Sequence, residues 1–199
     1  MTTRIGSFLF LILIASTAAA QAQSFDFGAH FAGARWSEFD GTDFGVGGRL
    51  SWKPRPVIGI EGEFNWYPSD FPGETFAFSG RRVEGLAAVT AGPRLDRIRP
   101  FMRFGAGFLR SSPAPEPFAC IAIFPPPLNC LLAAGETMPS LELGVGLEYS
   151  VTPRTFVRLD GGIRTQKYPG PSFTEDFEVK DEGFWGKAFK FTFGGGVRF

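Results

Sequence analysis

Charged side chains occur at alternating positions along several stretches of the chain. Because side chains alternate sides in a β-strand, residues of one parity share one face of a sheet. If that face is enclosed, its charges must be paired or hydrogen-bonded. Seven acids and seven bases predict a self-neutralising network that fills a lumen, and a narrow gated ion path is the alternative. The set is Asp26, Arg49, Glu61, Glu63, Arg82, Glu84, Arg103, Glu142, Glu148, Arg158, Asp160, Arg164, Lys190 and Arg198.

His30 is the only histidine, so it is the first candidate for acid–base chemistry. No Ser lies two residues away from it, and nothing else in the chain matches a nucleophile motif. No cluster of side chains has the spacing of metal ligands. We therefore expect His30 to join a hydrogen-bond network, and we expect no catalytic residue, metal or cofactor.

The first 22 residues have the order of a secretory signal peptide. A short basic region precedes an apolar run from Ile5 to Ala20, and Ala20-Gln21-Ala22 is a cleavage motif. The run is shorter than the ~20 residues that cross a bilayer as a helix. Residues 1–22 are thus predicted to be a signal peptide, and residues 23–199 one exported domain. The formal net charge is zero, so no basic excess indicates nucleic acid.

Cys120 and Cys130 are the only two cysteines. In an exported chain, a close and even pair predicts a disulfide. Both lie in a Pro-rich connection, about 111–138, that is apolar between Phe118 and Ala134. An exposed apolar patch often marks a surface for a partner. The alternative is that the disulfide folds this connection over the mouth of the domain.

A second long connection, from Pro169 to Gly186, carries the acidic run Glu175–Glu182. Carboxylates are ligands for divalent cations, which bridge lipopolysaccharide molecules. A solvated acidic loop is the simpler interpretation.

The alternation of polar and apolar residues predicts eight strands. High contents of Gly (26 residues) and Phe (24 residues), with interspersed Pro, favour strands and turns over helices. In the last strand, Phe189, Phe191, Phe193, Val197 and Phe199 share one face, and Lys190, Thr192 and Arg198 share the other. The expected strands are 25–36, 43–53, 57–67, 80–94, 99–110, 139–150, 155–168 and 189–199.

Short turns near Pro54, Asp96 and Pro153 alternate with a modest first loop and with long loops after the third, fifth and seventh strands. With an even number of strands, both termini and all three turns lie at one end. Strands of about ten residues match the length that crosses a bilayer at a tilt. The predicted fold is therefore all-β: an eight-stranded antiparallel up-and-down transmembrane β-barrel with short periplasmic turns and longer extracellular loops.

Alternation alone does not say which face is inside. Glycines interleaved with the charges favour a crowded lumen, and aromatic residues near strand ends predict interfacial girdles. These aromatic residues are Trp36, Trp52, Trp66, Tyr67, Tyr149 and Tyr168. A secreted lipocalin-like binding barrel is the soluble alternative, because Gly33 and Trp36 resemble the lipocalin G-x-W motif. Its interior would hold more Phe and Trp than eight strands accommodate.

These features together resemble the small outer-membrane barrels of the OmpA, OmpX and OmpW type, over nearly the whole of residues 23–199. The resemblance implies a place in the cell outer membrane of a Gram-negative-type envelope. It also implies that the outer-membrane assembly machinery reads the last strand through Phe189, Phe191, Phe193, Val197 and Phe199. It implies no single activity, since the fold serves several.

We therefore expect a non-enzymatic, monomeric barrel with a structural or surface-interaction role and no wide pore. Its expected partners are outer-membrane lipid and lipopolysaccharide, the assembly machinery, and a surface partner at the connection that contains Cys120 and Cys130. Two alternatives follow from relatives of this type. One is a narrow channel for small or apolar solutes, and the other is a lipid-modifying enzyme built around a His and a Ser.

Overall fold

The computed structural model describes residues 23–38, 42–68, 81–113, 132, 135–170, 172–173, 179–180 and 182–199. The predicted signal peptide, both cysteines and most of the acidic run lie outside these residues, so those expectations stay predictions. Within the described ranges, no helix is long and apolar enough to cross a membrane.

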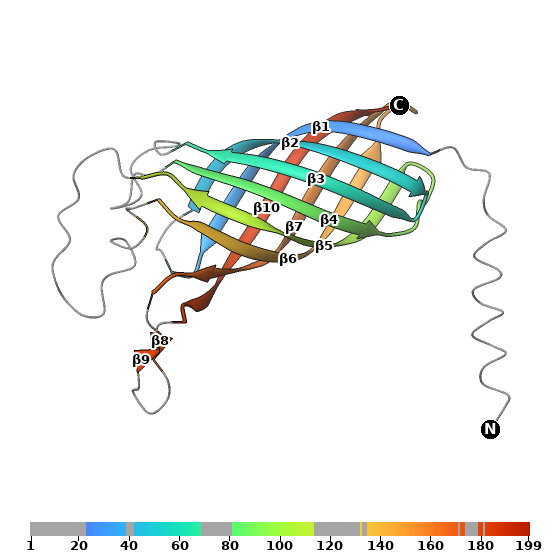
Figure 1. Cartoon of the computed structure of the whole chain (residues 1–199). Helices are drawn as coiled ribbons and strands as arrows, with labels where there is room; N and C mark the ends of the chain where they lie inside the picture. The colour runs from blue at the N-terminus through green and yellow to red at the C-terminus, as the bar shows by residue number, and fades with distance from the viewer. Residues whose placement is uncertain are drawn as a thin grey trace, which may run out of the picture.

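Eight long strands in the described part of the chain close into one barrel, in the order β1-β10-β7-β6-β5-β4-β3-β2, with every neighbour antiparallel (Figure 1). This confirms the predicted up-and-down barrel. The strands are β1 (Ser24–Trp36), β2 (Thr42–Arg55), β3 (Ile58–Tyr67), β4 (Arg82–Ala91), β5 (Ile98–Ser111), β6 (Thr137–Ser150), β7 (Thr155–Tyr168) and β10 (Phe184–Arg198).

The last strand closes the barrel onto the first, as the sequence predicts. Phe31 of β1 lies opposite Phe193 of β10, and the pairing runs from Asp26 to Trp36. Beyond β10, the backbone N–H of Phe199 donates to the carbonyl of Phe25 at 2.8 Å, and the Phe25 N–H donates back at 3.2 Å. Closure leaves no unpaired edge between the two chain ends.

Two expectations about the last connection are wrong. β10 begins at Phe184, five residues earlier than predicted, because the alternation of inward and outward residues already holds from Trp185 onward. A short hairpin also forms there, from β8 (Ser172–Phe173) and β9 (Val179–Lys180). The other seven strands begin and end within three residues of their predicted limits.

The two faces of the wall are opposite to those of a soluble barrel. The outward residues are apolar and exposed, as at Val145 with 61 % of its surface accessible. The inward residues are largely charged and buried, as at Arg164 with 0 % accessible. The face of each strand that carries the charged residues therefore lines the lumen.

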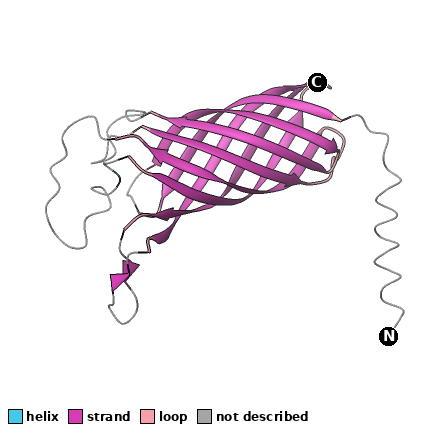
Figure 2. Ribbon diagram, viewed as in Figure 1, coloured by secondary structure: helices cyan, strands magenta, loops and turns pink. Residues whose placement is uncertain are grey.

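The two ends of the barrel are built differently. Tight turns follow β2, β4 and β6, and the chain termini of the barrel lie at that same end, which we call the turn end (Figures 1 and 2). Strands β1, β3, β5 and β7 end at the opposite end, the loop end, where β8 and β9 also lie. As predicted, the connections after β3, β5 and β7 are longer than the three turns, whereas the connection after β1 (37–41) is about as short as the turn after β4 (92–97). Asp96, in the turn after β4, has a left-handed backbone with φ of 53°, a conformation that Asp tolerates better than most residues.

Candidate functional site: the charged lumen

All fourteen charged residues named from the sequence point into the lumen. Thirteen of them are buried, and Arg198, near the turn end, is partly exposed. They come from all eight barrel strands, because each strand contributes side chains of one parity. Their ion pairs mostly cross the lumen, so the network ties strands that are not neighbours in the wall.

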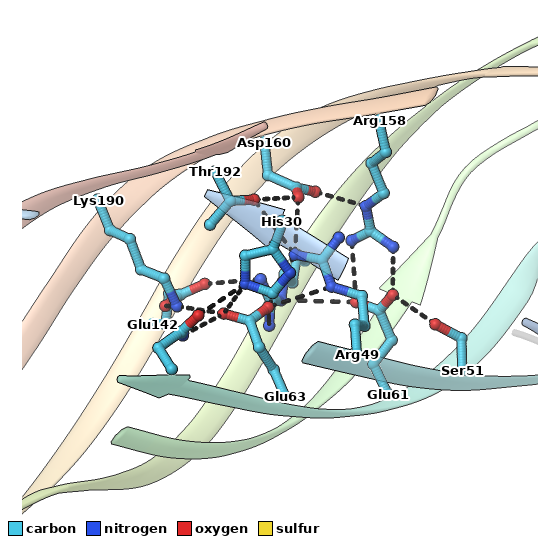
Figure 3. Close-up of polar contacts among 12 residues, drawn as sticks. His30, Arg49, Ser51, Glu61, Glu63, Glu142, Arg158, Asp160, Lys190 and Thr192 are labelled. Carbon is cyan, nitrogen blue, oxygen red and sulfur yellow. Dashed lines mark hydrogen bonds and ion pairs between the residues drawn. The ribbon is translucent and has the colours of Figure 1, made fainter. Parts of the chain in front are cut away.

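Glu63 of β3 is the centre of the network (Figure 3). Its carboxylate lies 2.5 Å from Lys190 Nζ, 2.8 Å from Arg49 Nη2 and 2.6 Å from Arg103 Nη2. The contact to Arg103 is an ion pair without the alignment of a hydrogen bond. Lys190 also reaches Glu142 at 3.2 Å. A fully buried carboxylate is thus held by three cations from three other strands.

A second group of ion pairs lies beside it, around Arg158 of β7. The Arg158 guanidinium bonds to Glu61 across the lumen and to Asp160 at 2.7 Å on its own strand. Asp160 also lies 2.9 Å from Arg49 Nη2 and accepts a hydrogen bond from the Thr192 hydroxyl at 2.7 Å. Arg49 therefore joins this group to the ion pairs of Glu63 with Lys190, Arg49 and Arg103, which we call the Glu63 cluster (Figure 3).

At the turn end, two acids share two bases. Lys53 Nζ lies 2.6 Å from Asp26 and 2.9 Å from Glu148. Arg198 donates to Asp26 at 3.0 Å and also contacts Glu148. The formal charges of these four side chains sum to zero.

At the loop end, Arg164 pairs with Glu84, and the Tyr67 hydroxyl donates to Glu84 at 3.0 Å. Arg82 pairs with Asp43, which also accepts a hydrogen bond from the Trp36 indole at 2.6 Å. Every one of the fourteen residues therefore has a charged partner inside the barrel.

Three charged residues of the lumen are missing from the sequence-based set: Asp43, Lys53 and Arg99. Each has the parity of a residue in the set, since Lys53 lies four residues after Arg49 and Arg99 four residues before Arg103. The parity was therefore sufficient to find them. With these three, the described residues place eight acidic and nine basic side chains in the lumen, so the excess charge is positive.

The predicted aromatic girdle is wrong for half of its members. Trp52, Trp66 and Tyr149 face outward, but Trp36, Tyr67 and Tyr168 are buried inside the barrel. An even separation along a strand places two side chains on the same face. Tyr67 is four residues from Glu63, and Tyr168 is four residues from Arg164, so both tyrosines point into the lumen.

These three aromatic residues belong to an apolar cluster inside the loop end. Leu109, Leu132 and Met138 pack in the same cluster. The Trp36 ring also lies 5.8 Å from the Arg164 guanidinium carbon and 5.9 Å from that of Arg82, within cation–π range. The cluster therefore covers the charged network from the loop side.

His30 lies in the lumen and belongs to the network. Its Nε2 is 2.6 Å from the Asn65 side-chain oxygen and 3.9 Å from Glu63. Gly47 makes this contact feasible, since a Cβ there would lie 2.1 Å from Asn65 Oδ1 and 2.5 Å from His30 Nε2. In the described ranges, no group of three His, Cys, Asp or Glu side chains is arranged to hold a metal ion.

The proposed assembly residues lie on the outer wall. Phe189, Phe191, Phe193 and Val197 are exposed on β10, and Phe199 is the most exposed of the large apolar residues that the structure describes. The Phe191 ring covers Gly33 of β1, where a Cβ would come within 2.2 Å of it. The aromatic face of β10 is thus continuous with that of β1 across the seam.

Solved structures of outer-membrane proteins are similar to this fold. One is a major outer membrane protein from Thermus thermophilus, with a TM-score of 0.54 and 14 % identity, over 90 % of this chain and 100 % of that chain. A second is the outer membrane protein OprG from Pseudomonas aeruginosa, with a TM-score of 0.52 and 10 % identity, over 90 % of this chain and 97 % of that chain. A third is Neisserial surface protein A, with a TM-score of 0.51 and 16 % identity, over 89 % of this chain and 97 % of that chain. No protein-family model matches the chain, and no curated protein is similar to it in sequence. The chain therefore has the fold of the small eight-stranded outer-membrane barrels.

The network predicts different consequences for two arginines of β5. Arg103 lies within 3.5 Å of Glu61, Glu63 and Glu142, whereas among the described residues the only carboxylate within 4.0 Å of Arg99 is that of Glu148. Replacing Arg103 by Met should lower the free energy of unfolding by about 3 kcal/mol or more, because buried acids lose a partner. Arg99→Met should be neutral or stabilising, since it removes a desolvated charge with little pairing.

The measurement is equilibrium unfolding in urea of each barrel folded in detergent micelles. Equal losses of stability in the two variants would contradict the assignment of Arg103 to the network.

Proposed function

We propose that the protein is an integral outer-membrane barrel with a closed lumen and a structural or surface-interaction role. The observation that carries the proposal is the arrangement of the wall, which buries its charges and exposes its apolar residues. In water such a surface would be a large apolar patch, whereas a bilayer requires it. The fold shared with outer-membrane barrels supports the same placement.

The orientation follows from the two ends. Barrels of this class place short turns in the periplasm and longer loops outside the cell. We therefore place the turn end in the periplasm and the loop end outside. Residues 1–22, as a cleaved signal peptide, would export the chain, and the outward aromatic residues of β10 with Phe199 would be recognised by the assembly machinery.

The filled lumen supports a non-conducting barrel. Side chains of the Glu63 cluster meet across the whole width of the barrel, from β2, β3, β5 and β10. Two pockets that reach lumen residues in this region have volumes of only about 10 Å³ each. A single water needs a volume of about 10–15 Å³, so each of these pockets has room for one water at most.

We further infer that the barrel is not an enzyme. His30 is buried in the lumen and bonded to Asn65, away from the outer wall where lipid would bind. The described residues place no Ser hydroxyl in hydrogen-bond contact with it.

Conductance across a planar bilayer tests the closed lumen. Folded protein, verified by a change of gel mobility on boiling, should give no sustained single-channel current, because crossing the network would require breaking several buried ion pairs. A reproducible current from the folded barrel would contradict the proposal. A mock preparation of detergent without protein is the control.

The interaction role is proposed for the connection that contains Cys120 and Cys130. Its apolar sequence and predicted disulfide suit a constrained surface outside the cell. Neisserial surface protein A, which shares the fold, is by its name a surface protein. Outer-membrane lipid and lipopolysaccharide would surround a monomeric barrel.

Thiol alkylation under denaturing conditions tests the predicted disulfide. Purified protein should gain alkyl groups at both cysteines only after reduction. Labelling of both thiols without reduction would contradict the disulfide. The double variant Cys120→Ser, Cys130→Ser, which should gain no label in either condition, is the control.

A further inference from the structure

The turn end of the barrel opens into a cavity of about 1520 Å³. It lies where the three short turns and the chain end meet, at the right-hand end of the barrel in Figure 1. The side chains of its wall carry an excess of positive charge, since two carboxylates, those of Asp96 and Glu148, face a larger set of bases. These bases are Lys53, Arg55, Arg94, Arg99, Arg154 and Arg198.

Part of this charge is already neutralised. Lys53 lies 2.6 Å from Asp26 and 2.9 Å from Glu148, and Arg198 donates to Asp26 at 3.0 Å and contacts Glu148. Of the four remaining bases, Arg99 lies 4.0 Å from Glu148, and Asp96 is the one other acidic side chain of the wall for Arg55, Arg94 and Arg154. Arg55, Arg94 and Arg154 are exposed and form no ion pair with another described residue. The cavity is therefore cationic, whereas the centre of the lumen is balanced.

Arg99 is the deepest of the uncompensated bases. It is 3 % exposed, and neither its Nε nor its Nη1 makes a hydrogen bond. Its Nη2 donates to the Thr90 hydroxyl at 3.4 Å, and its guanidinium lies 5.5 Å from the centre of the Phe101 ring. The Glu148 carboxylate, at 4.0 Å, is occupied by Lys53.

A buried guanidinium with two unpartnered nitrogens is unfavourable, because it has lost its hydration without a replacement. An oxyanion would supply that replacement, since the planar fork of Arg matches a carboxylate or a phosphate with two parallel hydrogen bonds. The exposed arginines at the rim would raise the local concentration of anions and guide them inward.

We propose that the turn-end cavity binds an organic anion with several carboxylate or phosphate groups, and that Arg99 is the anchor. The volume favours a multivalent ligand, because it exceeds the ~300–1000 Å³ of most small-molecule pockets. Prolines and Val57 supply apolar wall between the charges. If the proposed orientation holds, the anion comes from the periplasm, but the binding itself depends only on the folded barrel.

Calorimetric titration of citrate and of pyrophosphate into the barrel, folded in micelles of a nonionic detergent, tests this site. Both probes should bind saturably, and added salt should weaken the binding because the contacts are ionic. Arg99→Gln should reduce the affinity at least about tenfold. Tighter binding of citrate would identify a carboxylate ligand, and tighter binding of pyrophosphate a phosphate ligand.

Arg110→Gln is the matched control, because Arg110 is exposed on the same strand at the opposite end. It removes the same charge and should leave the affinity unchanged. If Arg99→Gln does not fold, Arg55→Gln combined with Arg154→Gln carries the test, since both are exposed at the rim and should weaken binding. The proposal is overturned if neither probe binds saturably. It is also overturned if the cavity variants and Arg110→Gln lose affinity to the same extent.

The titration is made in micelles, so it reports nothing about orientation or conductance. Its failure would leave the outer-membrane placement and the closed lumen untouched, and a conducting barrel would leave the anion site untouched.

Discussion

The structure depends on the pairing of charges in an enclosed space. Eight strands leave a lumen only wide enough for side chains. An unpaired ion there would carry a desolvation penalty of several kcal/mol. Each acid must therefore meet a base, and the partners come from strands across the barrel, as with Arg158 and Glu61, which are 97 residues apart. The network consequently helps to hold the stagger of the strands, because a slip by one residue would turn these charges toward the outer wall.

The same pairing explains how the two ends differ. The centre is neutral and filled, so the barrel wall acts as a scaffold instead of a passage. Toward the loop end, Trp36, Tyr67 and Tyr168 replace charge by apolar packing. Toward the turn end, bases outnumber acids, and Arg99 is left with unpartnered nitrogens. Chemistry that involves other molecules is therefore expected at the ends, and the middle provides rigidity.

Sequence periodicity was sufficient for the fold and for the face that each side chain takes. A period of two residues placed the strands, and parity placed Glu61, Glu63 and Arg103 in the lumen. Applied without exception, parity would also have placed Lys53, Arg99 and Tyr168 there. The partners within the lumen were beyond prediction, because they depend on the stagger of strands around the barrel. The cationic cavity was missed for the same reason: its bases come from separate turns and strands that only closure brings together.

The central claim is that the apolar outer wall lies in lipid while the charges are paired inside. It is tested most directly by placing an arginine at two depths on the outward face of β6, where Leu143 lies mid-strand and Thr137 lies at the loop end, both of them exposed. The measurement is the free energy of unfolding in lipid bilayers. A membrane barrel predicts that Leu143→Arg costs about 2–4 kcal/mol and Thr137→Arg about 0–1 kcal/mol. Near-zero costs at both positions would contradict the account, because an outward Arg on a barrel surrounded by water is already solvated.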